Sequence, residues 1–64
     1  MDIELEKDKI NMHVGKGNYH AAINLAISAL NECRRISDQS GVDTFLDVIN
    51  DIVHIMTDEF GRKA

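Results

Sequence analysis

Apolar residues recur every three or four positions from Val42 to Phe60, the longest stretch of sustained helical pattern in the chain. Positions three and four apart share one face of an α-helix, so this spacing predicts a helix over residues 42–60. Its apolar side consists of two overlapping stripes. The first comprises Phe45, Ile49, Ile52 and Met56, and the second comprises Val42, Leu46, Ile49, Val53, Met56 and Phe60. This apolar side is wider than one short neighbouring helix can cover.

A second helix is predicted over residues 18–36, where apolar residues are spaced four and three apart. These residues are Tyr19, Ile23, Ala26, Leu30 and Cys33. Asn18 is a favourable N-cap residue, and the cations Arg34 and Arg35 oppose the negative end of the helix dipole. The polar segment that follows, residues 37–41, is short, so we expect the two helices to pack as an antiparallel hairpin.

Residues 1–16 carry a different pattern. From Lys9 to Val14 polar and apolar residues alternate, which is typical of a half-buried strand. The glutamate, lysine, leucine and methionine residues of this segment favour a helix instead. From the alternation we predict an extended segment or short strand at Lys9–Val14, ended by Gly15 and Gly17.

The predicted fold class is mainly α: an antiparallel helical hairpin with an N-terminal extended or short-strand segment, in a single domain of residues 1–64. A hairpin needs one apolar stripe on each helix, and each helix here offers nearly two. Leaving the surplus in water forfeits roughly 1.5–3 kcal/mol per side chain. The surplus side chains are Leu25, Ile27, Val48 and Ile55. Two solutions stay open, separately or together: residues 1–16 fold back over the second face, or two hairpins dimerise into a four-helix bundle.

The homodimer is the simpler solution, because a chain of this size buries only about 60% of its unfolded surface and often needs a staple or a partner. Cys33 is the only cysteine. It therefore allows neither an intrachain disulfide nor a zinc site of four cysteines, or of two cysteines and two histidines. The residues expected to form the core and the dimer seam are Tyr19, Ile23, Ala26, Leu30, Phe45, Ile49, Ile52, Val53, Met56 and Phe60.

The composition, 44% hydrophobic and 28% charged residues, is that of a folded domain and not of a disordered one. No apolar run reaches the roughly 18 residues of a membrane span. The acidic N-terminus does not resemble a secretory signal, and one cysteine fits a reducing compartment. We therefore expect a cytoplasmic protein that does not contact membranes.

Acidic residues follow one side of the helix predicted at 42–60. Asp47, Asp51, His54 and Asp58 recur at spacings of four, three and four. Such a row can bind a divalent ion, but it is also what the solvated side of an amphipathic helix carries. We expect this side to be the solvated side of the helix, and we predict no metal and no cofactor. We hypothesise that it binds a basic surface of another protein. The net charge of −4 disfavours broad contact with nucleic-acid phosphates.

The residues do not indicate an enzyme. Cys33 lies within an apolar stripe, where cysteine behaves as a small hydrophobic residue and not as a nucleophile. His13 and His20 flank the segment Gly15–Gly17, which lacks the Lys-Ser/Thr pair of a phosphate-binding loop. We therefore predict a small non-enzymatic, homodimeric helical regulator or adaptor that acts by protein–protein interaction.

Residues 17–30, GNYHAAINLAISAL, resemble the second helix of a tetratricopeptide repeat. The matching positions are Gly17, Tyr19, Ala22, Ile23, Ala29 and Leu30. They cover half of one repeat. The resemblance implies close packing of helix against helix.

A second resemblance, to ribbon-helix-helix DNA-binding proteins, rests on Lys9–Val14 followed by two helices. In that family paired strands lie in the major groove, and alternate polar side chains read the base edges. The resemblance implies Lys9, Asn11 and His13 as the readers. A DNA-binding transcriptional regulator is therefore the alternative function.

Overall fold

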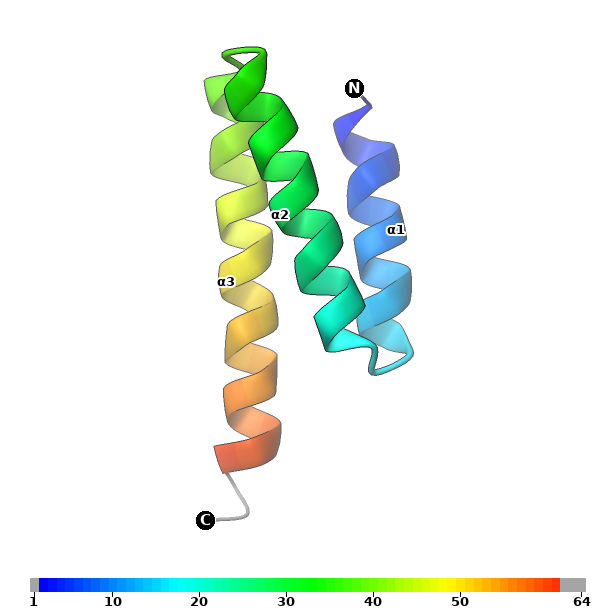
Figure 1. The fold of residues 1–64 in the computed structure, drawn as a ribbon. Coiled ribbons are helices and arrows are strands. Elements are labelled where there is room, and N and C mark those ends of the chain that lie inside the picture. Colours follow the sequence, from blue (N-terminus) through cyan, green and yellow to red (C-terminus); the bar gives the residue numbers. More distant parts are fainter. Residues whose placement is uncertain (1, 62–64) are drawn as a thin grey trace.

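Three helices make up residues 2–61, the part of the chain that this computed structural model describes: α1 (Ile3–Gly15), α2 (Tyr19–Arg35) and α3 (Gln39–Gly61). α2 and α3 form an antiparallel hairpin, and α1 packs beside α2 (Figure 1). The molecule is elongated, with extents of 41 × 18 × 14 Å. The predicted mainly α fold with a helical hairpin is confirmed. Within residues 2–61, no helix combines the length and the apolarity that crossing a bilayer requires.

The N-terminal segment is a helix, so the prediction of an extended segment or strand at Lys9–Val14 is wrong. Residues 2–61 contain no strand, and a single strand would leave its backbone polar groups without partners. The helix has a favourable start. The side chain of Asp2 accepts a hydrogen bond from the backbone N–H of Leu5 at 3.1 Å, as an N-cap residue does.

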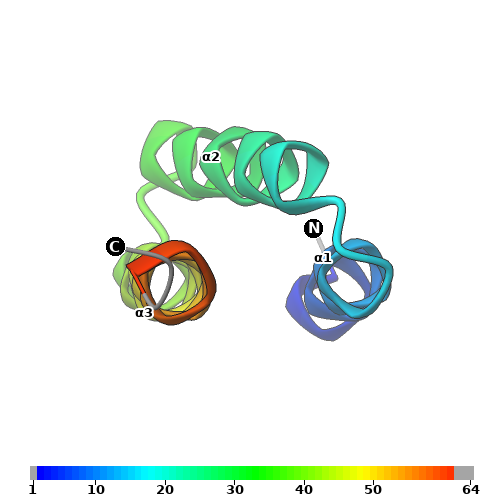
Figure 2. The ribbon, with the colours of Figure 1, turned by 90° about the horizontal axis from the view of Figure 1, so that it is seen from below.

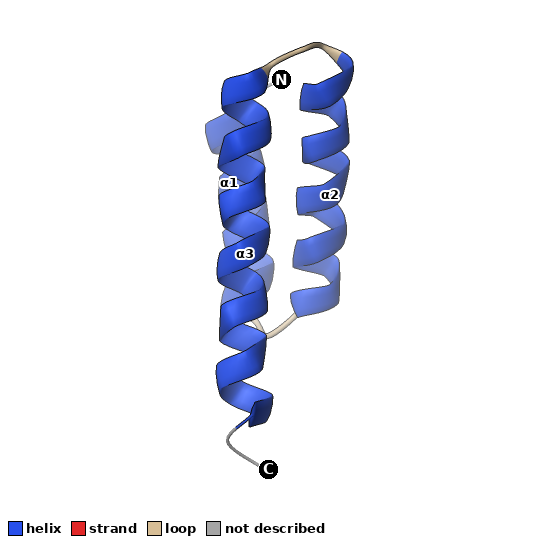
Figure 3. Cartoon of the chain, turned by 90° about the vertical axis from the view of Figure 1, so that its left-hand side faces the viewer, coloured by secondary structure: helices blue, strands red, loops and turns tan. Residues whose placement is uncertain are grey.

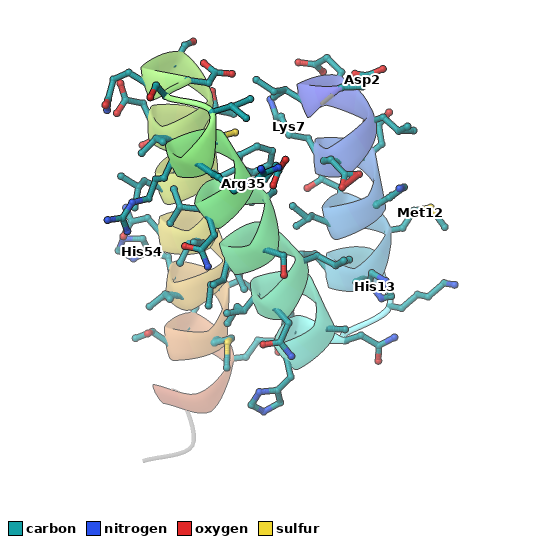
Figure 4. The ribbon with its side chains drawn as sticks, turned by 45° about the horizontal axis from the view of Figure 1, so that its top comes forward. Asp2, Lys7, Met12, His13, Arg35 and His54 are labelled. Atoms are coloured by element: carbon teal, nitrogen blue, oxygen red, sulfur yellow. The ribbon has the colours of Figure 1, made fainter. Side chains whose placement is uncertain are left out.

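Charged side chains along α1 also favour the helix over the strand. Lys7 Nζ lies 3.9 Å from Glu4 Oε1. Lys9 Nζ lies 3.1 Å from Glu6 Oε2. Pairs at this spacing stabilise a helix by about 0.2–0.5 kcal/mol each. The alternation was misleading because Met12, one of its apolar members, points away from α2 and is 62% exposed (Figure 4).

The turn between α1 and α2 is closed by a glycine. Gly17 has a φ of +77°, in the left-handed region that suits a residue without a side chain. The N–H of Asn18 then donates to the carbonyl oxygen of His13 at 2.8 Å, which satisfies one of the last carbonyls of α1. Asn18 precedes α2 as predicted, but its side chain makes no capping hydrogen bond.

α3 begins at Gln39, three residues before the predicted start at Val42. The reason is Asp38, whose Oδ1 accepts a hydrogen bond from the backbone N–H of Gly41 at 3.0 Å. A side-chain acceptor at this position caps a helix. The first turn of α3 is thus formed by residues expected in the connection, and it includes the buried Gly41.

α1 and α3 pack on the same side of α2 and make little contact with each other (Figures 2 and 3). The core lies between them and α2. Its buried residues are Ile10 of α1, Ala22, Ala26, Ala29 and Cys33 of α2, and Phe45 and Ile52 of α3. Because α2 supplies only small buried side chains, both other helices can approach it closely. Larger side chains of α1 and α3 fill the remaining space.

The position of α1 accounts for part of the apolar surplus. Leu25 and Val48 pack against the core. Ile27 and Ile55 stay exposed. Residues 2–16 therefore do fold back, mainly against α2, which is one of the two solutions left open by the sequence, but they cover only part of the apolar surface.

Candidate interaction surface

One long side of the α2–α3 hairpin is apolar and is not covered by α1. We call it the outer face; it comprises Ile23, Ile27, Leu46, Ile49, Val53 and Met56. Three of these side chains are about half exposed: Ile27 at 42%, Leu46 at 50% and Val53 at 46%. Single exposed apolar residues are common on protein surfaces, but a group of them on adjacent helices indicates a contact site.

The members of the outer face lie together for two reasons. Ile23 of α2 lines one shallow apolar hollow with Val53 and Met56 of α3, so these residues flank the same groove between the helices. Ile27 follows Ile23 by one helical turn, and Leu46 precedes Val53 by two, so both extend the same two sides. The apolar surface therefore runs along most of the hairpin.

The residues predicted for the core and the dimer seam fall into several groups. Ala26, Phe45 and Ile52 are buried inside the monomer, where a second chain cannot reach them. Partly buried members are Tyr19, Ile23, Leu30, Ile49 and Met56. Val53 is about half exposed. The side chain of Phe60 lies outside the described residues. Only the partly buried and exposed members remain available for a dimer contact.

The predicted acidic side of α3 is exposed along its length. Asp47, Asp51, His54 and Asp58 are all exposed. The labelled His54 projects away from α2 in Figure 4. In the described part of the chain, no three His, Cys, Asp or Glu side chains are grouped so that they could hold a metal ion. The arrangement is that of a solvated acidic surface.

Charge differs sharply between the two helices of the hairpin. α3 carries five acids and no lysine or arginine, whereas α2 carries two arginines and one glutamate. Arg35 Nε donates to Glu32 Oε2 at 3.0 Å, and this hydrogen bond holds the pKa of Glu32 below its ordinary value. Arg34, seven residues after Ile27, continues the α2 edge of the outer face and is exposed. A weakly basic helix therefore lies beside a strongly acidic one.

A hydrogen bond closes the far end of the hairpin. The hydroxyl of Tyr19, in the first turn of α2, donates to the carboxylate of Glu59 near the end of α3, which raises the pKa of Tyr19 above its ordinary value. Partial burial acts in the same direction. This contact ties the two helices together at the end opposite their connection.

Cys33 lies fully buried beside that connection, against the first turn of α3. Burial raises the pKa of the thiol, and the carboxylate of Asp38 adds to the effect. A reactive thiol requires the opposite shift, because the thiolate is the nucleophile. The position of Cys33 is therefore that of a small packing residue.

The three base-reading residues implied by the ribbon-helix-helix resemblance are not brought together. They lie on α1, where alternate residues point about 200° apart, so Lys9, Asn11 and His13 do not share one face. Lys9 is paired with Glu6, and Nδ1 of His13 is buried without a hydrogen-bond partner. The resemblance thus lacks the strand on which it depends.

Two members of the outer face, Ile27 and Leu46, were not among the predicted seam residues. The sequence contained an indication that each of these two residues could lie on such a face. Leu46 belongs to the second apolar stripe of its helix, and Ile27 is one of the surplus apolar residues. Sequence alone could not select them, because the stripes are wider than a single contact and α1 covers an unforeseen part.

Comparisons of the chain with protein-family models, with curated proteins and with solved structures found no match.

Proposed function

We propose that this protein is a small non-enzymatic, homodimeric helical regulator or adaptor that acts by protein–protein interaction. The observation that carries the proposal is the outer face, where Ile27, Leu46 and Val53 stay about half exposed although α1 packs on the hairpin. A second copy that presents the same face would bury them, because a two-fold axis lets one surface serve both chains.

A contact of standard size would take up a modest share of the exposed surface. The chain exposes 4466 Å², against about 4,100 Å² expected for a compact monomer of this mass. A standard interface removes about 800 Å² from each chain, which is roughly a fifth of the exposed area. Pairing of two α2–α3 hairpins would form a four-helix bundle, with α1 of each chain on its outside.

Dimerisation is tested with one substitution on the outer face and one matched control. We expect the wild-type chain to sediment at twice its 7.2 kDa mass, and Leu46→Lys to sediment as a monomer because the buried ammonium would lack a partner. Leu5→Lys is the control: Leu5 is 51% exposed, almost as Leu46 is, but it lies on α1. Helical circular dichroism checks that both variants fold.

A wild-type chain that remains a monomer at the highest attainable concentration contradicts the homodimer. Equal weakening by Leu5→Lys and Leu46→Lys contradicts the assignment of the contact to the outer face.

The acidic side of α3 supplies the second contact of an adaptor. Asp47, Asp51 and Asp58 are exposed and would appear twice on a symmetric dimer. Such a surface favours a partner protein with a basic face, through faster association and selection against acidic surfaces. The regulator or adaptor would thus join its own copy through one side of the hairpin and its partner through another.

We expect a tagged wild-type chain to recover a basic protein from extracts of its native cell, in a salt-dependent way. The triple substitution of Asp47, Asp51 and Asp58 by asparagine should lose that protein while it keeps the dimer. The matched control replaces Asp2, the N-cap residue of α1, and Asp8 on α1 by asparagine, and it should retain the protein. Recovery that is unchanged by the triple substitution would place the partner contact elsewhere.

A further inference from the structure

We infer that in the dimer the helix α2 of each chain lies along α3 of the second copy, antiparallel to it, and that Arg34 of one chain faces Asp43 of the other. The inference rests on the proposed homodimer. It specifies which helices meet in the dimer and which charged residues favour that arrangement.

Two arrangements bring the outer faces of two hairpins together around a two-fold axis. With the axis along the hairpin, α2 of one chain covers α3 of the second copy. With the axis across the hairpin, α2 covers α2 and α3 covers α3. Both bury the same apolar side chains, so burial does not distinguish them. The charges beside those side chains do.

The first arrangement places opposite charges together. α2 has two arginines against one glutamate, a net charge of +1, and α3 has five acids without a lysine or arginine, a net charge of −5. Pairing of like helices would instead set two α3 helices of net charge −5 against each other. Asp43, one helical turn before Leu46, is the acid that borders the outer face. Like charges across an interface disfavour association, whereas opposite charges speed it and set the register.

The register of the hairpin identifies the facing charges. Within one chain, Cys33 of α2 lies at the same position along the hairpin axis as Gly41 of α3, and Tyr19 lies at about the same position as Glu59. An axis along the hairpin leaves these levels unchanged, so the two pairs place Arg34 of one chain level with residues between 40 and 44 of the other. Arg34 and Asp43 are both exposed.

Charge reversal distinguishes the two arrangements. We expect Arg34→Glu and Asp43→Arg each to raise the dissociation constant of the dimer about tenfold, because each variant faces two like-charge contacts with its own copy. An equimolar mixture of the two variants should dimerise as the wild type does. In that heterodimer the two substituted side chains face each other with opposite charges, and the native Arg34 faces the native Asp43.

Matched controls make the same changes of charge outside the outer face. Lys16→Glu and Asp8→Arg reverse exposed charges at or near α1, and they should leave the dissociation constant unchanged. Sedimentation equilibrium at low salt measures the constants, and circular dichroism confirms that each variant remains helical.

The outcomes separate this inference from the function on which it rests. Single variants that dimerise as tightly as the wild type, or more tightly, overturn the α2–α3 pairing and leave the homodimer standing. Pairing of like helices makes no contact between Arg34 and Asp43, and Asp43→Arg would relieve the repulsion between its two α3 helices. A mixture that fails to restore affinity also overturns the pairing. A monomeric wild type overturns the homodimer and the pairing together.

Discussion

Replacing Phe45 with alanine is expected to lower the free energy of unfolding by about 3–5 kcal/mol, the usual cost of removing a large aromatic side chain from a core. Phe45 is the largest fully buried side chain and belongs to the cluster between α2 and its two neighbours. A domain of this length has a total stability of roughly 3–10 kcal/mol. The substitution should therefore remove from about a third of it to all of it. Urea unfolding followed by circular dichroism measures the change.

A graded control separates the loss of volume from other effects. Phe45→Leu keeps most of the apolar volume and should cost less than about 1.5 kcal/mol. All variants are compared at one protein concentration, since any dimer makes apparent stability depend on concentration. An unfolding midpoint of Phe45→Ala equal to that of the wild type would show that this side chain is not in the core.

Gly41→Ala is expected to destabilise the protein by about 1–3 kcal/mol, the usual cost of forcing extra volume into a packed site. Alanine is intrinsically the better helix former, by up to about 1 kcal/mol, so propensity alone predicts the opposite sign. A β-carbon at Gly41 would lie 2.5 Å from Sγ of Cys33 and 2.9 Å from Oδ2 of Asp38. Neither neighbour is a flexible chain end, because Cys33 is buried and Asp38 caps the helix.

Gly15→Ala is the matched control for this prediction. Gly15 ends α1, and a β-carbon there meets no atom within 4 Å, so the substitution should be neutral or stabilising by up to about 1 kcal/mol. Adding Cys33→Ala to Gly41→Ala should recover stability, because the new methyl group takes the space of the lost sulfur atom. Thermal unfolding of the four chains measures the coupling. Equal stability of Gly41→Ala and Gly15→Ala would contradict the close approach of α2 and α3.

The N-terminal segment shows how a local pattern can predict the wrong element. The alternation from Lys9 to Val14 has the period of a strand, but a strand is stable only when its backbone pairs with another. No other strand forms in residues 2–61. The helix satisfies its own backbone, and Asp2 together with the ion pairs of Lys7 and Lys9 adds further local support.

α3 begins at Gln39 and not at the predicted Val42 for a related reason. Ser37, Asp38 and Ser40 are all acceptable N-cap residues, so the sequence offers several starting points. Asp38 is the one whose carboxylate reaches the N–H of Gly41. The choice depends on packing, because starting the helix there brings Gly41 against Cys33.

The sequence by itself determined the hairpin of α2 and α3 and the burial of Phe45 and Ile52, because helical periodicity and connection length are local properties that survive without knowledge of the rest of the chain. The tertiary structure alone decided which apolar stripe α1 covers. That choice follows from the row of small residues on α2, which lets α1 approach on one flank, and it leaves Ile27, Leu46 and Val53 exposed on the other. Exposure is a property of the whole assembly of helices, and so the candidate interaction surface could be located only once all three had been placed.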